Sequence, residues 1–194
     1  MKTKDLLQKL KGIRKSYFSF TDLSKMYEGS GEELRVTLHR LAKQEKLTRL
    51  MKGYYALNPD IDWEQFACEI VRPSYISLEY ALWHHGILDQ VPTSITLITT
   101  KSTREHVLTN HVLEYSHIDP NLYFGAKIEG SHLIAEKEKA ILDEIYMISL
   151  RKRHLNFKSL DLAGVNNKLL KTLMKRFPIY TQKLALEVIS NTKL

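Results

Sequence analysis

The sequence predicts an α+β protein of two parts, with helices and a hairpin in the first part and a small sheet in the second. Short amphipathic helical patterns and a glycine-centred turn fill residues 1–60. Residues 94–135 instead contain several β-branched runs, with helical patterns before and after them. A turn-forming Asn-Pro-Asp sequence at 58–60 separates the two regions, so we expect domains at 1–60 and 61–194.

The distribution of charge follows the same division. Residues 1–60 contain 13 Lys/Arg and 7 Asp/Glu, a net charge of +6, whereas residues 61–150 contain 6 and 13, a net charge of −7. Residues 151–194 contain 10 and 2, a net charge of +8, and the whole chain carries +7. A basic first domain is typical of a protein that binds a polyanion, although a solvated surface would show the same composition.

The first domain contains the pattern of two short helices joined by a tight turn. Thr21 is the expected cap of the first helix, and Glu28-Gly29 ends it. Ser30 and Glu33 form a capping box that begins the second helix, which extends to about Lys43. Two such helices with a glycine-containing connection are typical of a helix-turn-helix, and a further helix at 3–11 is expected to pack beneath them.

A predicted hairpin follows, with strands at 47–50 and 54–57, Gly53 in its turn, and residues 17–20 as a third strand. The complete pattern predicts an N-terminal winged helix-turn-helix, whose second helix would enter the major groove of DNA. A small helical cap without a nucleic-acid role is the alternative. The predicted DNA-binding residues lie on the second helix and the hairpin: Ser30, Arg35, Val36, His39, Arg40, Lys43, Arg49 and Lys52.

The second domain is expected to be a small, mostly antiparallel sheet with flanking helices. Ser77 is the expected cap of a helix that ends at Gly86, and the polar residues 100–111 are expected to form a long exposed loop. The expected strands are 94–99, 113–118, 123–129 and 132–135, and the other expected helices are 62–71, 136–150, 161–177 and 180–190.

A basic C-terminal face is also predicted. The helix expected at 161–177 has an apolar side of Leu162, Val165, Leu169, Leu173 and Phe177 and an opposite basic side. The predicted basic residues are Arg151, Lys152, Arg153, Lys168, Lys171 and Lys175. A solvated surface and a site for an acidic partner or nucleic acid both remain open for this face.

Recognisable catalytic motifs are missing from the sequence. It contains no P-loop, GxGxxG, GxSxG, CxxC or HExxH pattern. His84 and His85 are helical neighbours that point about 100° apart, a poor arrangement for sharing one metal ion. Three acids of the helix expected at 136–150, Glu138, Asp143 and Glu144, are expected on a solvated face. We therefore expect no enzyme, no cofactor and no metal.

The remaining sequence features concern the cellular compartment. The N-terminus lacks the apolar region of a signal peptide, and the chain has no run of 18 apolar residues, so no membrane association is expected. Cys68 is the only cysteine, and we expect it to pack in the core. One cysteine allows no intramolecular disulfide, which fits a cytoplasmic protein.

Four stretches in this order give the chain a family resemblance: KGYYAL at 52–57, YISLEYALWHHGI at 75–87, ITTKSTR at 98–104 and IAEKEKAILDEIYM at 134–147. They resemble the AbiEi family, antitoxins of type IV toxin–antitoxin systems in bacterial abortive infection, a form of phage defence. The resemblance implies a first domain that binds double-stranded operator DNA and acts as a transcriptional regulator of its own operon. It also implies a second domain that opposes a nucleotidyltransferase-type toxin without requiring a stable complex.

Two other functions stay open on the sequence. One is a winged-helix transcriptional regulator with a ligand- or protein-sensing domain and no toxin. The other is an enzyme, such as a nuclease, delivered by a DNA-binding domain.

Overall fold

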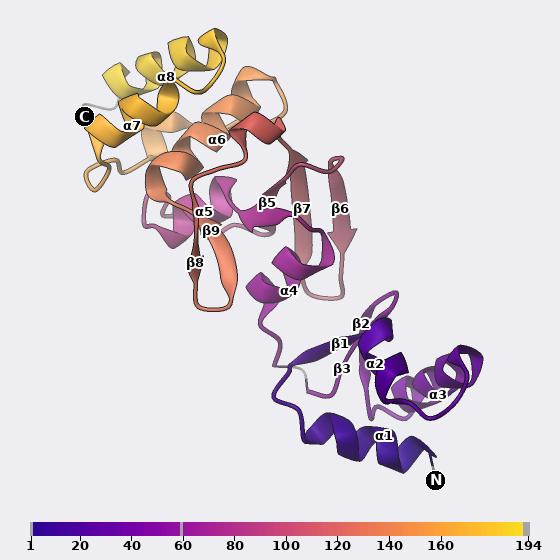
Figure 1. Ribbon diagram of the computed structural model, residues 1–194. Helices are drawn as coiled ribbons and strands as arrows, with labels where there is room; N and C mark the ends of the chain where they lie inside the picture. Colours follow the sequence, from indigo (N-terminus) through magenta and orange to yellow (C-terminus); the bar gives the residue numbers. More distant parts are fainter. Residues whose placement is uncertain (1, 59, 192–194) are drawn as a thin grey trace. The chain divides into compact units, whose positions relative to one another are not determined.

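The computed structural model describes residues 2–58 and 60–191, and the chain divides into two compact units, Met1–Phe66 and Ala67–Leu194. The protein is a mixed α/β chain with two separate sheets (Figure 1). The division between the units falls six residues after the expected boundary, inside a helix.

The first unit combines helices with a three-stranded antiparallel sheet of order β1-β3-β2. Gly53 occupies the turn between β2 and β3 with φ +84°, a conformation that a side chain would strain. The elements are α1 (Lys2–Lys11), β1 (Tyr17–Ser19), α2 (Phe20–Met26), α3 (Gly31–Lys43), β2 (Thr48–Met51) and β3 (Tyr54–Ala56).

The expected cap of α2 at Thr21 is wrong. β1 runs directly into α2, so the helix begins at Phe20 and Thr21 already lies inside it. Ser19 is the cap: its Oγ accepts from the Asp22 amide at 3.1 Å, and the Ser19 amide donates to the Asp22 carboxylate at 3.0 Å. The Ser30 cap of α3 is confirmed, since its Oγ accepts from the Glu33 amide at 3.2 Å.

The core of the first unit is built from leucines of all three helices. Leu6 and Leu10 of α1 pack with Leu34, Leu38 and Leu41 of α3, and each is no more than 1% exposed. Because these apolar positions recur with the helical period, burying them fixes which side of α3 faces outward.

The second unit contains a six-stranded mixed sheet of order β6-β7-β5-β4-β9-β8. The pairings β4–β5, β6–β7 and β8–β9 are antiparallel, whereas β5–β7 and β4–β9 are parallel. The strands are β4 (Ser74–Ile76), β5 (Ile95–Thr99), β6 (Arg104–Val107), β7 (Val112–His117), β8 (Ala126–Glu129) and β9 (His132–Ala135).

Helix α6 occupies the middle of the helical layer of the second unit, with α5, α7 and α8 packed against it (Figure 1). The helices are α4 (Trp63–Ile70), α5 (Leu78–His84), α6 (Lys137–Ser149), α7 (Asn167–Met174) and α8 (Ile179–Asn191), with 3₁₀ turns η1 (Pro120–Leu122) and η2 (Phe157–Ser159). Within residues 2–58 and 60–191, no helix is both long and apolar enough to cross a membrane.

Two expected segments of the second unit differ from the structure. The expected loop at 100–111 contains strand β6, which pairs with β7. The helix expected at 161–177 is shorter, because the segment before it bonds to another part of the unit: the Asp161 amide donates to the Ile87 carbonyl at 2.8 Å. α7 begins only after the Asn166 cap, and it buries Leu170 and Met174.

Candidate nucleic-acid interface and buried polar clusters

The outward face of α3 is apolar at its centre and polar around it. With four positions of α3 buried in the core, the helical period places Glu32, Val36, His39 and Lys43 on the opposite side. All four are exposed, and Val36 is 70% exposed. The outward face of α3 therefore presents one apolar and several polar side chains to solvent.

Arg35 and Arg40 flank this face and are held at its two edges. The Arg35 guanidinium lies 5.0 Å from the ring centroid of Phe20 in α2. Arg40 Nη2 donates to Thr3 Oγ1 in α1 at 2.7 Å. Both arginines are exposed, so their guanidinium groups are oriented by these contacts and remain accessible.

The hairpin turn lies beside the start of α2. The Phe20 amide donates to the Gly53 carbonyl at 2.7 Å, so Phe20 contacts both the turn and the Arg35 guanidinium. Lys52 in this turn and Arg49 in β2 are both exposed. Phe20 therefore contacts both the hairpin turn and Arg35, which lies at one edge of the outward face of α3. Ser30, also a predicted contact residue, is exposed and caps α3.

The predicted basic C-terminal face is exposed at five of its six residues. Lys168 and Lys171 of α7 are exposed, as are Lys175, Arg151 and Lys152. Arg153 does not belong to this face, because its side chain is only 14% exposed and points into a group of carboxylates.

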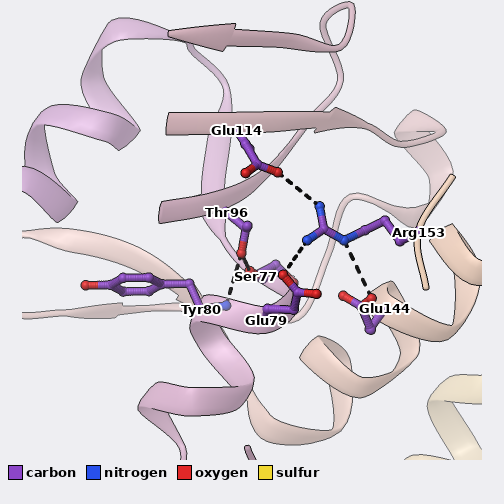
Figure 2. Close-up of polar contacts among 7 residues, drawn as sticks. All are labelled: Ser77, Glu79, Tyr80, Thr96, Glu114, Glu144 and Arg153. Atoms are coloured by element: carbon purple, nitrogen blue, oxygen red, sulfur yellow. Dashed lines mark hydrogen bonds and ion pairs between the residues drawn. The ribbon is translucent and has the colours of Figure 1, made fainter. Parts of the chain in front are cut away.

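Arg153 lies among three glutamates from three elements (Figure 2). Its Nη2 donates to Glu79 of α5 at 2.6 Å and its Nη1 to Glu114 of β7 at 3.3 Å. Its Nε lies 3.6 Å from Glu144 Oε1 of α6, an ion pair beyond hydrogen-bond length. Arg153 thereby joins the segment after α6 to the sheet and to two helices. Burial raises the pKa of Glu144 to about 7, while the nearby Arg153 charge opposes the rise.

A second polar cluster joins β4 to α6 and is closed to solvent. Tyr75 Oη and Ser77 Oγ donate to Asp143 Oδ2 at 2.9 and 2.8 Å, and Lys139 pairs with Asp143 and donates to Tyr75 Oη at 2.9 Å. The Lys139 Nζ also lies 4.8 Å from the ring centroid of Phe124. Burial lowers the pKa of Lys139 and raises that of Asp143, although each partner charge opposes the effect. Because both charged side chains are 0% exposed, this cluster is suited to holding the fold together.

Ser77 occupies the expected N-cap position of α5, but its side chain makes no cap hydrogen bond. Its hydroxyl is committed to Asp143, and α5 has no side-chain cap from Ser77. Thr96 of β5 takes this role: its Oγ1 accepts from the Tyr80 amide in the first turn of α5 at 3.0 Å (Figure 2). A sequence pattern cannot reveal a cap supplied from another strand.

The expectation of a solvated acidic face on α6 is also wrong. Glu138, Asp143 and Glu144 are 7%, 0% and 1% exposed. Packing of α5, α7 and α8 around α6 leaves no acidic face open, and Glu138 accepts from the Asn166 amide at 2.7 Å. The signal in the sequence was the Lys139–Asp143 pair at i,i+4 in a helix with apolar residues on every side.

The histidine pair and the cysteine have separate surroundings. His84 Nε2 lies 2.8 Å from Glu129 Oε1, whereas His85 Nε2 lies 2.7 Å from the Ala135 carbonyl. Burial lowers the pKa of His85. Cys68 is half-buried rather than fully in the core, with its Sγ 3.6 Å from the Leu133 carbonyl. Within the described ranges, no group of three or more His, Cys, Asp or Glu side chains could hold a metal ion.

Comparison with known proteins gave no matching family model and no matching curated protein. What the chain binds therefore has to be inferred from its own side chains.

Proposed function

We propose that the first unit is a winged helix-turn-helix that binds double-stranded operator DNA, and that the protein represses its own operon from the cytoplasm. The observation that carries this proposal is the outward face of α3, with exposed Val36 at its centre and oriented arginines at both edges. An α-helix with polar and small apolar side chains on one face fits the major groove.

The positions of these side chains favour base contacts for some of them and phosphate contacts for others. His39 and Lys43 can bond base edges, and Val36 can contact the methyl group of thymine. Arg35 and Arg40, held at the edges, suit the phosphates on either side of the groove, and Lys52 and Arg49 of the hairpin suit phosphates further along. The first sixty residues supply a net charge of +6 to attract the duplex.

The proposal for the second unit rests on the AbiEi resemblance. We propose that it acts as the antitoxin against a nucleotidyltransferase-type toxin, without catalysis of its own. Two of the four resembling stretches, 75–87 and 134–147, supply Tyr75, Ser77, Lys139 and Asp143. The residues that carry the resemblance thus include those that join β4 to α6.

The experiment that tests DNA binding is a gel-shift titration of the full chain against the DNA upstream of its own gene. We expect a saturable complex that survives competitor DNA, and loss of it in a Val36→Glu/His39→Glu double variant. Lys25→Glu, on the exposed side of α2, is the matched control and should bind normally. Equal affinity for the upstream DNA and for unrelated DNA would contradict an operator-binding role.

The antitoxin role is tested by co-expression with the product of the adjacent gene, scored by growth beside a promoter reporter. Growth rescue together with repression supports the proposal. Repression without rescue would instead identify a winged-helix regulator with a sensing domain and no toxin.

A further inference from the structure

A cavity of about 540 Å³ lies in the first unit, at the C-terminal end of α1. Its walls come from α1, from the chain just after α3 and from the chain just after β3, and every described lining residue belongs to the first unit. None of these lining residues lies on α3 or on the β2–β3 hairpin. The volume is within the range of small-molecule sites, roughly 300–1,000 Å³.

Part of the cavity lining is apolar. Leu7 and Leu57 are half-buried there, and Ile13 is 42% exposed. These side chains adjoin the leucine core, because Leu10, which also lines the cavity, is 0% exposed and packs among the core leucines. An apolar body placed against them would remove their remaining surface from water, which is favourable.

The lining also carries positive charge. Lys11, Lys15 and Lys46 line the cavity, opposed within it by Asp60. Lys15 also pairs with Asp22 at 2.9 Å, so the excess of positive charge rests chiefly on Lys11 and Lys46. Two lysines that line one cavity favour a ligand with an anionic group.

We propose that this cavity binds a small amphipathic anion, with an apolar chain or ring against Leu7, Ile13 and Leu57 and a carboxylate between Lys11 and Lys46. The site lies between α1 and the segment that follows α3, so an occupant would contact α1 and Lys46 of that segment. This inference does not depend on DNA binding.

The test is a titration of the isotope-labelled full chain followed by amide NMR shifts, with octanoate as the probe. We expect saturable shifts concentrated on the amides of the cavity residues. Acetate, inorganic phosphate and octylammonium at the same concentration should leave these amides unshifted. Acetate and phosphate test the need for the apolar body, and octylammonium tests the need for the negative charge.

Variants distinguish the site from general adsorption. Lys11→Glu/Lys46→Glu should weaken octanoate at least tenfold, and Ile13→Ser should weaken it severalfold, while Lys25→Glu on α2 should leave it unchanged. The amide spectra report directly that each variant is folded. Unchanged octanoate affinity in the lysine double variant, equal shifts with octylammonium or phosphate, or shifts outside the cavity residues would each overturn the proposal.

Discussion

Replacing Glu144 by glutamine should make the protein more stable above neutral pH, although it removes a partner of the buried Arg153. Glu144 is 1% exposed, and in the part of the chain that the structure describes neither of its carboxylate oxygens has a hydrogen-bond partner. Its nearest cation is the Arg153 guanidinium, whose Nε lies 3.6 Å from Glu144 Oε1. The other two nitrogens of this guanidinium pair with Glu79 and Glu114. A carboxylate in this position loses more from burial than Arg153 returns.

The magnitude follows from the pKa of Glu144, which burial raises from 4.5 to about 7. The folded state keeps the Glu144 proton up to about pH 7, whereas the unfolded chain releases it above about pH 4.5. The unfolded state then binds fewer protons, so this group's contribution to stability is present at low pH and is lost as the pH rises through about 7. Between pH 5 and 8 the loss amounts to roughly 2–3 kcal/mol.

The assay is urea unfolding of wild type and Glu144→Gln from pH 5 to pH 8 at constant ionic strength, followed by circular dichroism. The variant should match wild type near pH 5 and exceed it by roughly 2–3 kcal/mol at pH 8, because glutamine resembles the protonated carboxyl. His85, whose pKa burial lowers, contributes a pH dependence of the opposite sign, and the difference between the two proteins cancels it.

The matched control is Glu114→Gln, which removes another carboxylate that Arg153 contacts. Its side chain is 35% exposed, so solvent screens its charge and the variant should show no comparable pH dependence. A difference between Glu144→Gln and wild type that stays constant from pH 5 to 8 would refute the reasoning. It would mean that Arg153 holds Glu144 ionised throughout.

The other predictions concern single contacts. Arg35→Ala should weaken operator binding by roughly 1–3 kcal/mol and lower its salt dependence, measured by gel shift at several salt concentrations; an unchanged affinity would place α3 outside the groove. Gly53→Val should lower the melting temperature of the first unit, because valine resists φ +84°; a melting temperature equal to wild type would contradict the strained turn. Asp143→Ala should cost roughly 3–5 kcal/mol in chemical denaturation by leaving Lys139 buried and unpaired, and adding Lys139→Met should restore much of the loss. A fragment ending at residue 60 should melt lower than one ending at residue 71, because Phe66 packs 4.9 Å from Tyr17.

The parts of the fold that sequence patterns predicted are those governed by near neighbours in the chain. The Ser30 cap, the length of α3 and the positive φ of Gly53 depend on residues a few positions apart, and the structure confirms them. The cap of α2 was wrong because the preceding strand runs directly into the helix. The cap position of α5 at Ser77 was right, but Thr96 from β5, rather than Ser77, accepts from an amide of its first turn. Short strands such as β4 and β6 were missed because pairing, rather than their composition, makes them strands.

In the candidate DNA-binding site, too, the features set by near neighbours could be predicted and those set by distant residues could not. The outward face of α3 follows from the helical period, so its residues could be assigned from the sequence. The contacts that hold Arg35 against Phe20 and Arg40 against Thr3 join different elements, so the helical period alone could not reveal them. The burial of Arg153 could not be predicted from its position in the sequence, because it depends on Glu79, Glu114 and Glu144, which come from other elements.

The same enclosure changes how the charge of the second unit should be interpreted. Residues 61–150 carry a formal net charge of −7, yet Glu144 is buried and Glu79 and Glu114 are paired with Arg153. The acidity that this region presents to a partner is therefore weaker than its composition suggests. Residues 151–194 carry a formal +8, and although Arg153 is enclosed, the lysines of this range on α7 are exposed. An acidic partner, whether protein or nucleic acid, is consequently better matched to the C-terminal helices than to the sheet.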